Sequence, residues 1–340
     1  MSIGPPMSYE PLLSVCIITY NHGAYITQAI ESVLRQKTNF PIEIIIGEDG
    51  SSDTTRDIVL GYRDRFPNKI RVLLGERKNV IYINDRPTGR RNLIDVLSAA
   101  TGKYIARLEG DDFWIDPLKL QKQVDVMEAH PEYSVCGHWV INVGEDGEVL
   151  RPQIFTGESC PEIFSLQDAI SGTPLHFNSL VFRRFNLIKQ PMYPFLLKMP
   201  MADCPLMLML LGQGNGYCLK ERMSAYRIHS TGSWSAIARY HKEFELLQFR
   251  FGAIRYLDWR YVPWLLILIG RNIASLILNI AHVSVSTRAL TPIKEFVRLI
   301  KIQKTIPPYC MVPLFLLGIV FLPLNVMKYI KRRITEHAFN

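Results

Sequence analysis

The sequence predicts an α/β fold in which helices flank a largely parallel β-sheet. Between residues 12 and 130, short apolar runs alternate with amphipathic stretches, and strands that alternate with helices at this spacing form parallel sheets. Polar clusters follow three of the apolar runs, at residues 19–22, 48–53 and 109–112. Because parallel strands end at one edge of their sheet, we expect these clusters to meet in a ligand-binding crevice there.

The individual elements follow in order along the chain. Each expected strand is a short run of buried-type side chains, and each expected helix carries apolar residues three or four positions apart. The strands are expected at residues 13–20, 42–47, 70–74, 103–108, 133–143, 177–182 and 216–219, and the helices at 24–36, 54–66, 92–100, 117–129, 204–211 and 235–258. Residues 133–230 mix the two types and are the least regular part.

Three carboxylates, Glu109, Asp111 and Asp112, directly follow the apolar run 103–108. A buried strand gains nothing from them, because an unpaired buried charge is costly or shifts its pKa. At the carboxyl end of a strand they suit a hard divalent cation, Mg²⁺ or Mn²⁺, which could hold a phosphorylated ligand. An acidic turn that caps the next helix is the alternative for this cluster alone. The convergence of three polar clusters favours a functional site.

The charge of the chain is unevenly placed. Residues 231–340 contain 15 Lys and Arg against 5 Asp and Glu, whereas residues 1–230 contain 24 against 26. The basic excess accompanies apolar sequence in a chain that is 48% hydrophobic with a mean hydropathy of +0.07. This pairing favours an anionic membrane surface as partner. It argues against nucleic acid, which would need basic residues interleaved with aromatics on the functional domain.

Cysteine usage indicates a reducing compartment. The six cysteines form no C-x-x-C pair, and several lie inside apolar runs. They are therefore expected to be reduced core residues of a cytosolic domain and to form neither a disulfide framework nor a zinc site. The N-terminus shows no basic segment followed by an apolar one, so a secretory signal is not expected.

Two long apolar stretches, residues 261–286 and 309–327, lie in the basic C-terminal third. The second has no charged residue and is just long enough to cross a bilayer, which needs about 20 residues. The linker between them and the tail are both basic, and the positive-inside rule places both in the cytoplasm, which fits neither one nor two full crossings. A membrane-embedded hairpin or interfacial helices fit better, with a buried helical pair in a soluble domain as the alternative. We therefore expect a catalytic domain over residues 1–235 and a helical membrane-association region over 236–340.

Three segments together resemble the family 2 glycosyltransferases of the GT-A fold. They are VCIITYN at 15–21, EDGSSDT at 48–54 and EGDD at 109–112. The resemblance is strong over residues 12–130 and looser to about 235. It implies a Rossmann-like, mixed and mostly parallel sheet, a nucleotide-sugar donor and Mg²⁺ or Mn²⁺. Glu48 and Glu109 stand where many members have Asp, and both keep the charge, so a working site with slightly altered reach is expected.

The resemblance also implies how the nucleotide sugar is held. Thr19, Tyr20 and Asn21 would line the nucleotide pocket, and Asp49 would hydrogen-bond the base. A carboxylate can accept the imide N–H of uracil or thymine, which adenine lacks, so a UDP- or dTDP-sugar is expected. Asp111 matches the metal ligand of the family.

Further positions of the family site fall on other parts of the chain. Asp112 would support the metal or contact the sugar. Arg91 and Asn92 lie near the position where a cation meets the diphosphate, with an exposed helix start as the alternative. Arg227 and His229, in the segment 226–230, could contact phosphate, and His229 could also join the metal shell.

Transfer to an acceptor hydroxyl needs a base, and the resemblance implies Asp203 at the start of a helix. A helix N-cap is the competing interpretation, because Pro205 follows two residues later. With Asp203 as the base, the resemblance implies an inverting transfer.

Together these expectations describe an enzyme of bacterial cell-surface polysaccharide synthesis, for example of lipopolysaccharide. It would act at the cytoplasmic face of the plasma membrane on a membrane-held glycan or a polyprenyl-diphosphate-linked acceptor. A catalytically degenerate, membrane-bound scaffold that binds nucleotide sugars is the alternative. A sugar nucleotidyltransferase is less favoured, because residues 19–24 lack a glycine-rich phosphate loop with a basic residue.

Overall fold

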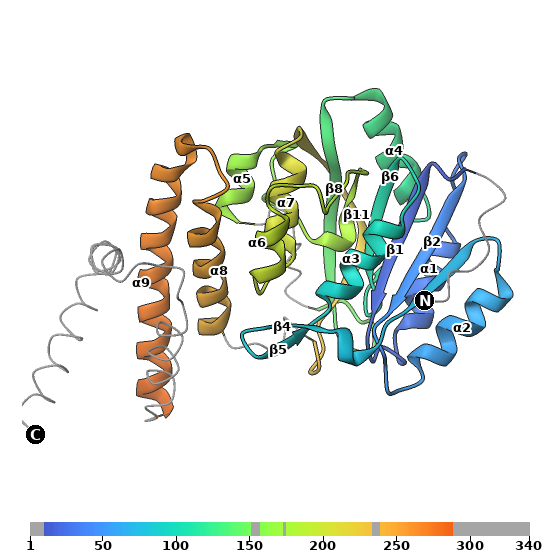
Figure 1. Ribbon diagram of the computed structural model, residues 1–340, viewed down its shortest axis with the longest axis horizontal. Coiled ribbons are helices and arrows are strands. Elements are labelled where there is room, and N and C mark those ends of the chain that lie inside the picture. Colours follow the sequence, from blue (N-terminus) through green and yellow to red (C-terminus); the bar gives the residue numbers. More distant parts are fainter. Residues whose placement is uncertain (1–9, 151–156, 173–174, 233–238, 288–340) are drawn as a thin grey trace, which may run out of the picture. The chain divides into compact units, whose positions relative to one another are not determined.

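The computed structural model describes residues 10–150, 157–172, 175–232 and 239–287 (Figure 1). Contacts within the chain divide it into two compact units, residues 1–235 and 236–340. The first unit contains the β-sheet and the helices around it, and the second contains α8 (Arg239–Ala253) and α9 (Val262–Thr287). A catalytic role for the first unit and a membrane role for the second stay predictions.

A nine-stranded sheet forms the centre of the described part of the first unit, in the order β3-β2-β1-β6-β10-β8-β11-β7 with β9 beside β11. The pairings among β3, β2, β1 and β6 and between β8 and β11 are parallel, whereas the short strands β7, β9 and β10 run antiparallel to their neighbours. The sheet is therefore mixed. Its strands are β1 (Leu13–Thr19), β2 (Ile42–Glu48), β3 (Ile70–Leu74), β6 (Tyr104–Glu109), β7 (Phe113–Trp114), β8 (Tyr133–Val143), β9 (Ile163–Phe164), β10 (Val181–Arg183) and β11 (Asn215–Arg227).

Helices flank this sheet, as the sequence predicts. Their bounds are α1 (Ile26–Leu34), α2 (Thr55–Arg65), α3 (Arg90–Ala99), α4 (Lys119–Ala129), α5 (Leu166–Ser171), α6 (Tyr193–Lys198) and α7 (Asp203–Leu211). The strands β1 and β2 are buried almost throughout, because helices cover both faces of a parallel sheet. One continuous core joins side chains of β1, β2, β3 and β6 to those of α1, α2 and α4.

The strand register brings the polar clusters to one edge. Thr19 lies opposite Glu48 in the pairing of β1 with β2, and Ile18 lies opposite Glu109 in the pairing of β1 with β6. The three strands therefore end at the same level. The residues that follow them begin at one common edge of the sheet, which is where the sequence predicts a crevice.

Two expected strands differ in the structure. Residues 177–182 form a 3-10 turn, Phe177–Ser179, before β10, because the His176 side chain accepts a hydrogen bond from the Asn178 N–H and turns the chain. The strand expected at 216–219 continues to Arg227, past the polar residues 220–222, where the register shifts. Residues 226–227, expected in a loop, therefore end a strand. The hairpin of β4 (Ile81–Ile83) and β5 (Arg86–Thr88) is too short to show in the sequence pattern.

In the second unit, α8 and α9 are joined through buried polar groups. Asn272, which interrupts the apolar stretch 261–286, donates to Glu243 over 2.7 Å and accepts from Arg250. Ser275 donates to the same glutamate over 2.9 Å. The apolar stretch is thus a helix that packs against α8 on one side.

Membrane association through an embedded hairpin or interfacial helices was expected from the two apolar stretches. Within the described ranges, no helix has the length and apolar character needed to span a bilayer. The apolar stretch 309–327 and the basic tail lie outside the described residues, as do residues 235–238, where the sequence predicts the start of α8.

Candidate active site

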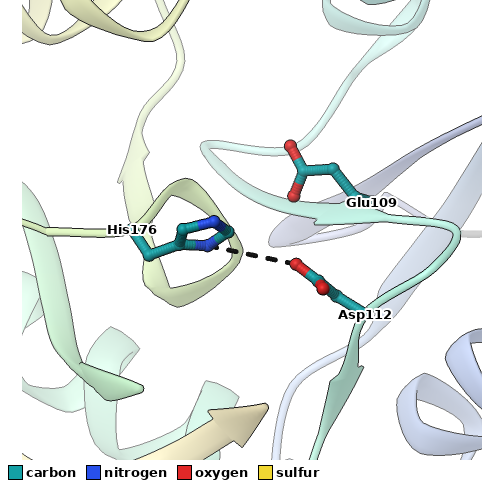
Figure 2. Close-up of side chains that lie close together, drawn as sticks. All are labelled: Glu109, Asp112 and His176. Carbon is teal, nitrogen blue, oxygen red and sulfur yellow. Dashed lines mark ion pairs between the residues drawn. The ribbon is translucent and has the colours of Figure 1, made fainter. Parts of the chain in front are cut away.

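The carboxylates at the end of β6 lie beside three histidines, His176, His229 and His22. Glu109 ends the strand, and Asp112 directly precedes β7. Figure 2 shows Glu109 and Asp112 facing His176, which comes from the turn before β10. One ligand atom from each of these three residues lies within 4.8 Å of the others, and the His176 Nδ1 atom is 4.0 Å from the Asp112 Oδ2 atom. His176 was not expected, because nothing in its local sequence marks it.

Asp112 is the buried centre of this cluster. Its Oδ1 atom accepts the backbone N–H of Arg227 over 2.9 Å, and its Oδ2 atom accepts the Asn178 side-chain amide over 2.8 Å. Burial raises the pKa of Asp112 well above its ordinary value, and the charges of Asp111 and Glu109 raise the pKa further. Burial is also the main cause of the raised pKa of Glu109.

Asp111 lies beside the imidazole rings of His229 and His22. Its Oδ2 atom is 3.1 Å from Nε2 of His229 and 3.6 Å from Nε2 of His22. Burial opposes ionisation of Asp111, but the hydrogen bond from His229 and the charge of His22 outweigh it, so its pKa is lowered. The Nδ1 atom of His229 contacts the Thr231 hydroxyl at 2.9 Å, which fixes the ring. The structure thus brings His229 to Asp111, although the two are far apart in sequence.

Several buried polar atoms here have no hydrogen-bond partner among the described residues. They are the Glu109 Oε2, Thr19 Oγ1 and His22 Nδ1 atoms. Buried polar groups are normally satisfied, so unpaired ones are consistent with a missing ion or ligand. Carboxylate oxygens suit Mg²⁺ and Mn²⁺, while imidazole nitrogens suit transition ions. The mixed donor set therefore fits a divalent cation, and it fits Mn²⁺ better than Mg²⁺.

Gly110 allows the carboxylate turn to approach β1. A Cβ atom at this position would lie 2.6 Å from the Thr19 hydroxyl and 2.8 Å from Nδ1 of His22. The Gly110 N–H donates to the Ile18 carbonyl over 2.9 Å. Any side chain at this position would push the carboxylate turn away from β1 and its histidine.

A second polar group lies where β2 ends. Asp49 is buried, and its Oδ2 atom is 3.0 Å from Nη1 of Arg77. Burial raises the pKa of Asp49 to about 6, against the lowering effect of Arg77. The Arg77 guanidinium also lies 4.1 Å from the centre of the exposed Tyr20 ring. The sequence reasoning missed Arg77, although its place soon after β3 was a usable signal.

Thr19 and Asn21 connect these strand ends. The Thr19 carbonyl accepts the Asp49 N–H over 3.0 Å. Asn21 has a positive φ of 52° and bonds to Ser51 and Ser52 of the next loop, at 2.9 Å each. Asn21 therefore holds the two loops together, and its expected place in the nucleotide pocket stays a prediction.

Of the two expected residues on α3, neither points to the carboxylate cluster. The Arg91 side chain is exposed and pairs with Asp95 one turn later, at 2.9 Å. The Asn92 amide donates to the Gly47 carbonyl over 2.8 Å, so it fastens α3 to β2. The buried cation of this helix is the preceding Arg90, which donates to the Met199 carbonyl over 2.6 Å.

Arg227 holds together three segments around the site. Its Nε atom donates to the Asp111 carbonyl over 3.0 Å, and its Nη2 atom donates to Gln28 of α1 over 2.6 Å. Its Nη1 atom donates to the carbonyls of Gly144 at 3.1 Å and Glu145 at 2.5 Å. Four of the five N–H donors of the guanidinium are thereby used. The position of Arg227 agrees with a site residue, but most of its donors fix protein segments.

Asp203 reaches the carboxylate cluster through Arg107. The buried Arg107 guanidinium donates to Oδ1 of Asp203 over 2.7 Å and to Glu109 over 2.5 Å, and it lies 4.9 Å from the centre of the Phe177 ring. Asp203 is the first residue of α7; Ala202 is its N-cap, and no side chain caps the helix. The competing interpretation of Asp203 as an N-cap is therefore wrong. Arg107, inside an apolar strand, was not expected.

Known proteins place this geometry in a family. The model of the family described as glycosyl transferase family 2 matches residues 14–189, slightly more than half of the chain. An uncharacterised protein of Mycobacterium tuberculosis is 36% identical over 223 residues, which are 65% of this chain and 60% of that protein. The chain thus spans less than two thirds of the length of this relative.

Two further proteins bear on the fold and family. A putative teichuronic acid biosynthesis glycosyltransferase of Bacillus subtilis is 28% identical over 71% of this chain and 92% of its own. The solved structure of a mannosyltransferase from Pyrobaculum calidifontis, in complex with GDP-mannose and Mn²⁺, covers 93% of this chain and 88% of its own with a TM-score of 0.54. At 16% identity it shows a shared fold. With the matched family model and the strand-end carboxylates, the chain belongs to glycosyl transferase family 2.

Proposed function

We propose that this protein transfers a sugar from a nucleoside diphosphate to an acceptor hydroxyl. The observation that carries the proposal is the ion pair of Arg107 with both Glu109 and Asp203. It joins the strand-end carboxylates, which suit a metal-bound diphosphate, to a carboxylate that suits proton abstraction. The proposed ligand-binding carboxylates and the proposed base are thus connected through the side chain of Arg107.

Asp49, Tyr20 and Arg77 form the proposed base pocket. The Asp49 carboxylate accepts the imide N–H of a pyrimidine, and its pKa of about 6 leaves it mostly ionised at pH 7. The Tyr20 ring offers a face on which a base can stack. These features support a UDP- or dTDP-sugar as the donor.

Asp111, Asp112 and His229 are the proposed metal ligands, with Glu109 and His176 as further candidates on the other side of Asp112. When bound, Mn²⁺ or Mg²⁺ would supply positive charge to the departing diphosphate. Arg227 and the Asn178 amide hold Asp112 in place through its two oxygens. A preorganised carboxylate site of this kind avoids reorganisation when the sugar bond breaks.

Asp203 is the proposed general base. Arg107 holds its Oδ1 atom, and among the described residues nothing donates to its Oδ2 atom. That oxygen is available to take the proton of the acceptor hydroxyl as the hydroxyl attacks the anomeric carbon. Attack opposite the departing diphosphate gives an inverted product. The exposure of the Asp203 side chain, 43%, supports access for an acceptor.

The proposed acceptor is a membrane-held glycan or a polyprenyl-diphosphate-linked sugar at the cytoplasmic face of the bacterial plasma membrane. Its support is the basic, apolar sequence of residues 231–340 together with the teichuronic acid relative, which points to surface polysaccharide. A nucleic-acid partner is not part of the proposal. The apolar side chains of α9 can serve such a region without crossing the bilayer.

The direct test is turnover of UDP-, dTDP- and GDP-sugars by the purified chain, with and without Mn²⁺. We expect Mn²⁺-dependent hydrolysis or transfer from one pyrimidine nucleotide sugar. In Asp111→Ala, addition of Mn²⁺ should no longer increase turnover. Asp125→Ala, which changes an exposed carboxylate on α4, serves as the matched control. Nucleotide binding without turnover, even with membrane extracts as acceptor, would favour the scaffold function. No nucleotide binding at all would refute the site.

A further inference from the structure

The turn between α8 and α9 exposes large apolar side chains. Trp259 begins the 3-10 helix Trp259–Tyr261, and 77% of its surface is exposed. On the first turns of α9, Leu266 and Ile267 are 36% and 37% exposed, and Pro263 is exposed as well. Exposed apolar surface costs roughly 25 cal/mol per Å² in water. A cluster of exposed apolar side chains therefore indicates a surface that contacts a partner or a membrane.

These four residues form one strip, which we call the exposed apolar strip: Trp259, Pro263, Leu266 and Ile267. Pro263, Leu266 and Ile267, three and four positions apart, lie on one side of the α9 start, and Trp259 lies in the 3-10 helix that directly precedes it. The residues between and beyond them, Leu265, Leu268 and Ile269, are buried. α9 therefore begins with apolar residues on two sides, and among the described residues only one of these sides is buried.

The covered side of α9 is fixed by polar contacts that have nothing to do with the strip. Asn272 bonds to Glu243 and Arg250 of α8, and Arg250 also donates to the Leu268 carbonyl over 3.2 Å. Buried, satisfied polar groups of this kind set which side of a helix faces its neighbour. The rotation of α9 that exposes the strip is thus specified, and the strip is not needed for the packing of α8 on α9.

The charges around the strip are almost all positive. Arg260 directly follows Trp259, and Arg255 lies four positions before it; both are exposed. Arg271, four positions after Ile267, is exposed as well. The single acid of the turn, Asp258, caps the 3-10 helix and pairs with Arg260 at 3.1 Å. From residue 259 to 287 the sequence contains no Asp or Glu. Arginines that flank a tryptophan and aliphatic side chains match an anionic lipid surface.

We propose that the exposed apolar strip inserts into the headgroup region of an anionic bilayer, with Trp259 deepest and the flanking arginines against lipid phosphates. The inference rests on the membrane association within the proposed function, and it deepens that association by naming the contacting surface. The contact is interfacial, so it anchors the protein beside a lipid-linked acceptor and leaves both ends of α9 on one side of the membrane.

The test is sedimentation of the full chain with vesicles of phosphatidylcholine, alone or mixed with phosphatidylglycerol. We expect binding to the mixed vesicles, and binding about tenfold weaker for Trp259→Ala and for the double variant Leu266→Ser with Ile267→Ser. Tyr82→Ala is the matched control, because Tyr82 is an aromatic residue 64% exposed in the first unit. Brominated lipids should quench tryptophan emission in the wild type and markedly less in Trp259→Phe.

Several outcomes would overturn the strip while leaving other conclusions intact. If the strip variants bind the mixed vesicles like the wild type, and Lys331→Glu with Arg332→Glu and Arg333→Glu loses binding, membrane association holds but the strip is wrong. If the wild type binds no vesicle, membrane association itself fails, while donor turnover remains a separate result. If the strip variants only convert a dimer to a monomer, the strip contacts a second copy of the chain.

Discussion

The donor side and the acceptor side of the candidate site are built in different ways. On the donor side, Asp49, Asp111 and Asp112 are largely buried, and each carboxylate has at least one fixed partner. On the acceptor side, Asp203 is 43% exposed and is held through one oxygen. A group that binds a ligand gains from being fixed in advance, whereas a group that accepts a proton needs one oxygen left open. The difference assigns binding to one side and reaction to the other.

Removal of the Asp203 charge should break the comparison most sharply. In Asp203→Asn we expect turnover to fall ~1000-fold, within the usual contribution of a general base, because the amide cannot accept the proton. The affinity for UDP with Mn²⁺ should stay unchanged, since donor-side groups are untouched. Rates with the donor found active and calorimetry with UDP provide the two readouts. Full turnover in this variant would show that Asp203 is not the base.

Arg107→Met tests the link between the two sides. The variant leaves Glu109 and Asp203 without their shared cation, and breaking a buried pair costs about 3 kcal/mol of unfolding free energy. We expect turnover to fall ~100-fold, because Asp203 is no longer held. The double variant with Asp203→Asn should be no slower than Asp203→Asn alone.

The control for this link is Arg183→Met. Arg183 on β10 is also mostly enclosed, and it donates to the carbonyls of Tyr133 at 2.8 Å and Met127 at 2.6 Å. Its loss should reduce stability without a specific loss of turnover in the remaining folded protein. Additive losses of activity in Arg107→Met and Asp203→Asn would mean that Arg107 acts only on the fold.

Lys119 is a buried cation whose partners are an amide and an aromatic ring, in contrast to Arg107, which pairs with two carboxylates. Its Nζ atom donates to Gln123 over 2.8 Å and lies 4.1 Å from the centre of the Trp114 ring. Burial lowers its pKa to about 7. Between pH 7 and about 10 the unfolded chain binds the proton more tightly than the folded chain, so this group makes stability rise with pH.

Lys119→Met should remove that slope. The variant is expected to gain stability over the wild type by roughly 1 kcal/mol for each pH unit on going from pH 9 down to pH 7. Urea unfolding at pH 7, 8 and 9 measures the difference. Lys103→Met, at an exposed lysine paired with Glu128, should show no such trend. A pH-independent difference for Lys119→Met would mean that Lys119 is charged in the folded state.

The smallest expected effect concerns the base pocket. The pKa of Asp49 is raised to about 6, and the ionised carboxylate accepts an imide N–H in a stronger hydrogen bond than the protonated acid does. Uridine, which needs no metal, should therefore bind up to about fourfold more weakly at pH 5.5 than at pH 7.5. Asp49→Ala, which has no side-chain acceptor, should bind weakly at both values. Equal uridine affinity for the wild type at the two pH values would remove Asp49 from the base pocket.

Part of this architecture follows from local sequence. The strands β1, β2, β3 and β8 are short runs of mostly apolar, β-branched or aromatic side chains, so the sequence pattern finds them. The carboxylates at 109–112 are visible because they end such a run. The match of the family model to residues 14–189 confirms the resemblance that these segments indicated.

The remaining part depends on contacts between distant residues. Arg107 meets Asp203 across 96 positions, and Asn178 meets Asp112 across 66, so no local spacing announces either pair. An arginine inside an apolar strand and a histidine before a 3-10 turn look unremarkable until the sheet is assembled. For the same reason, the position of Asn21 and Asn92 in the sequence could not show that they hydrogen-bond to neighbouring loops and strands.

The contacts of Arg227 also have a consequence for how the protein is made. Gln28, the carbonyls at 111 and 144–145, and the Oδ1 atom of Asp112 all accept hydrogen bonds from the side chain or the backbone N–H of Arg227. A nascent chain that has emerged only through β8 already carries every carboxylate of the donor side, but Asp111 and Asp112 still lack their partners His229, Arg227 and Asn178. During synthesis the ability to bind a nucleotide sugar should therefore arise abruptly, when β11 leaves the ribosome, and not grow with length.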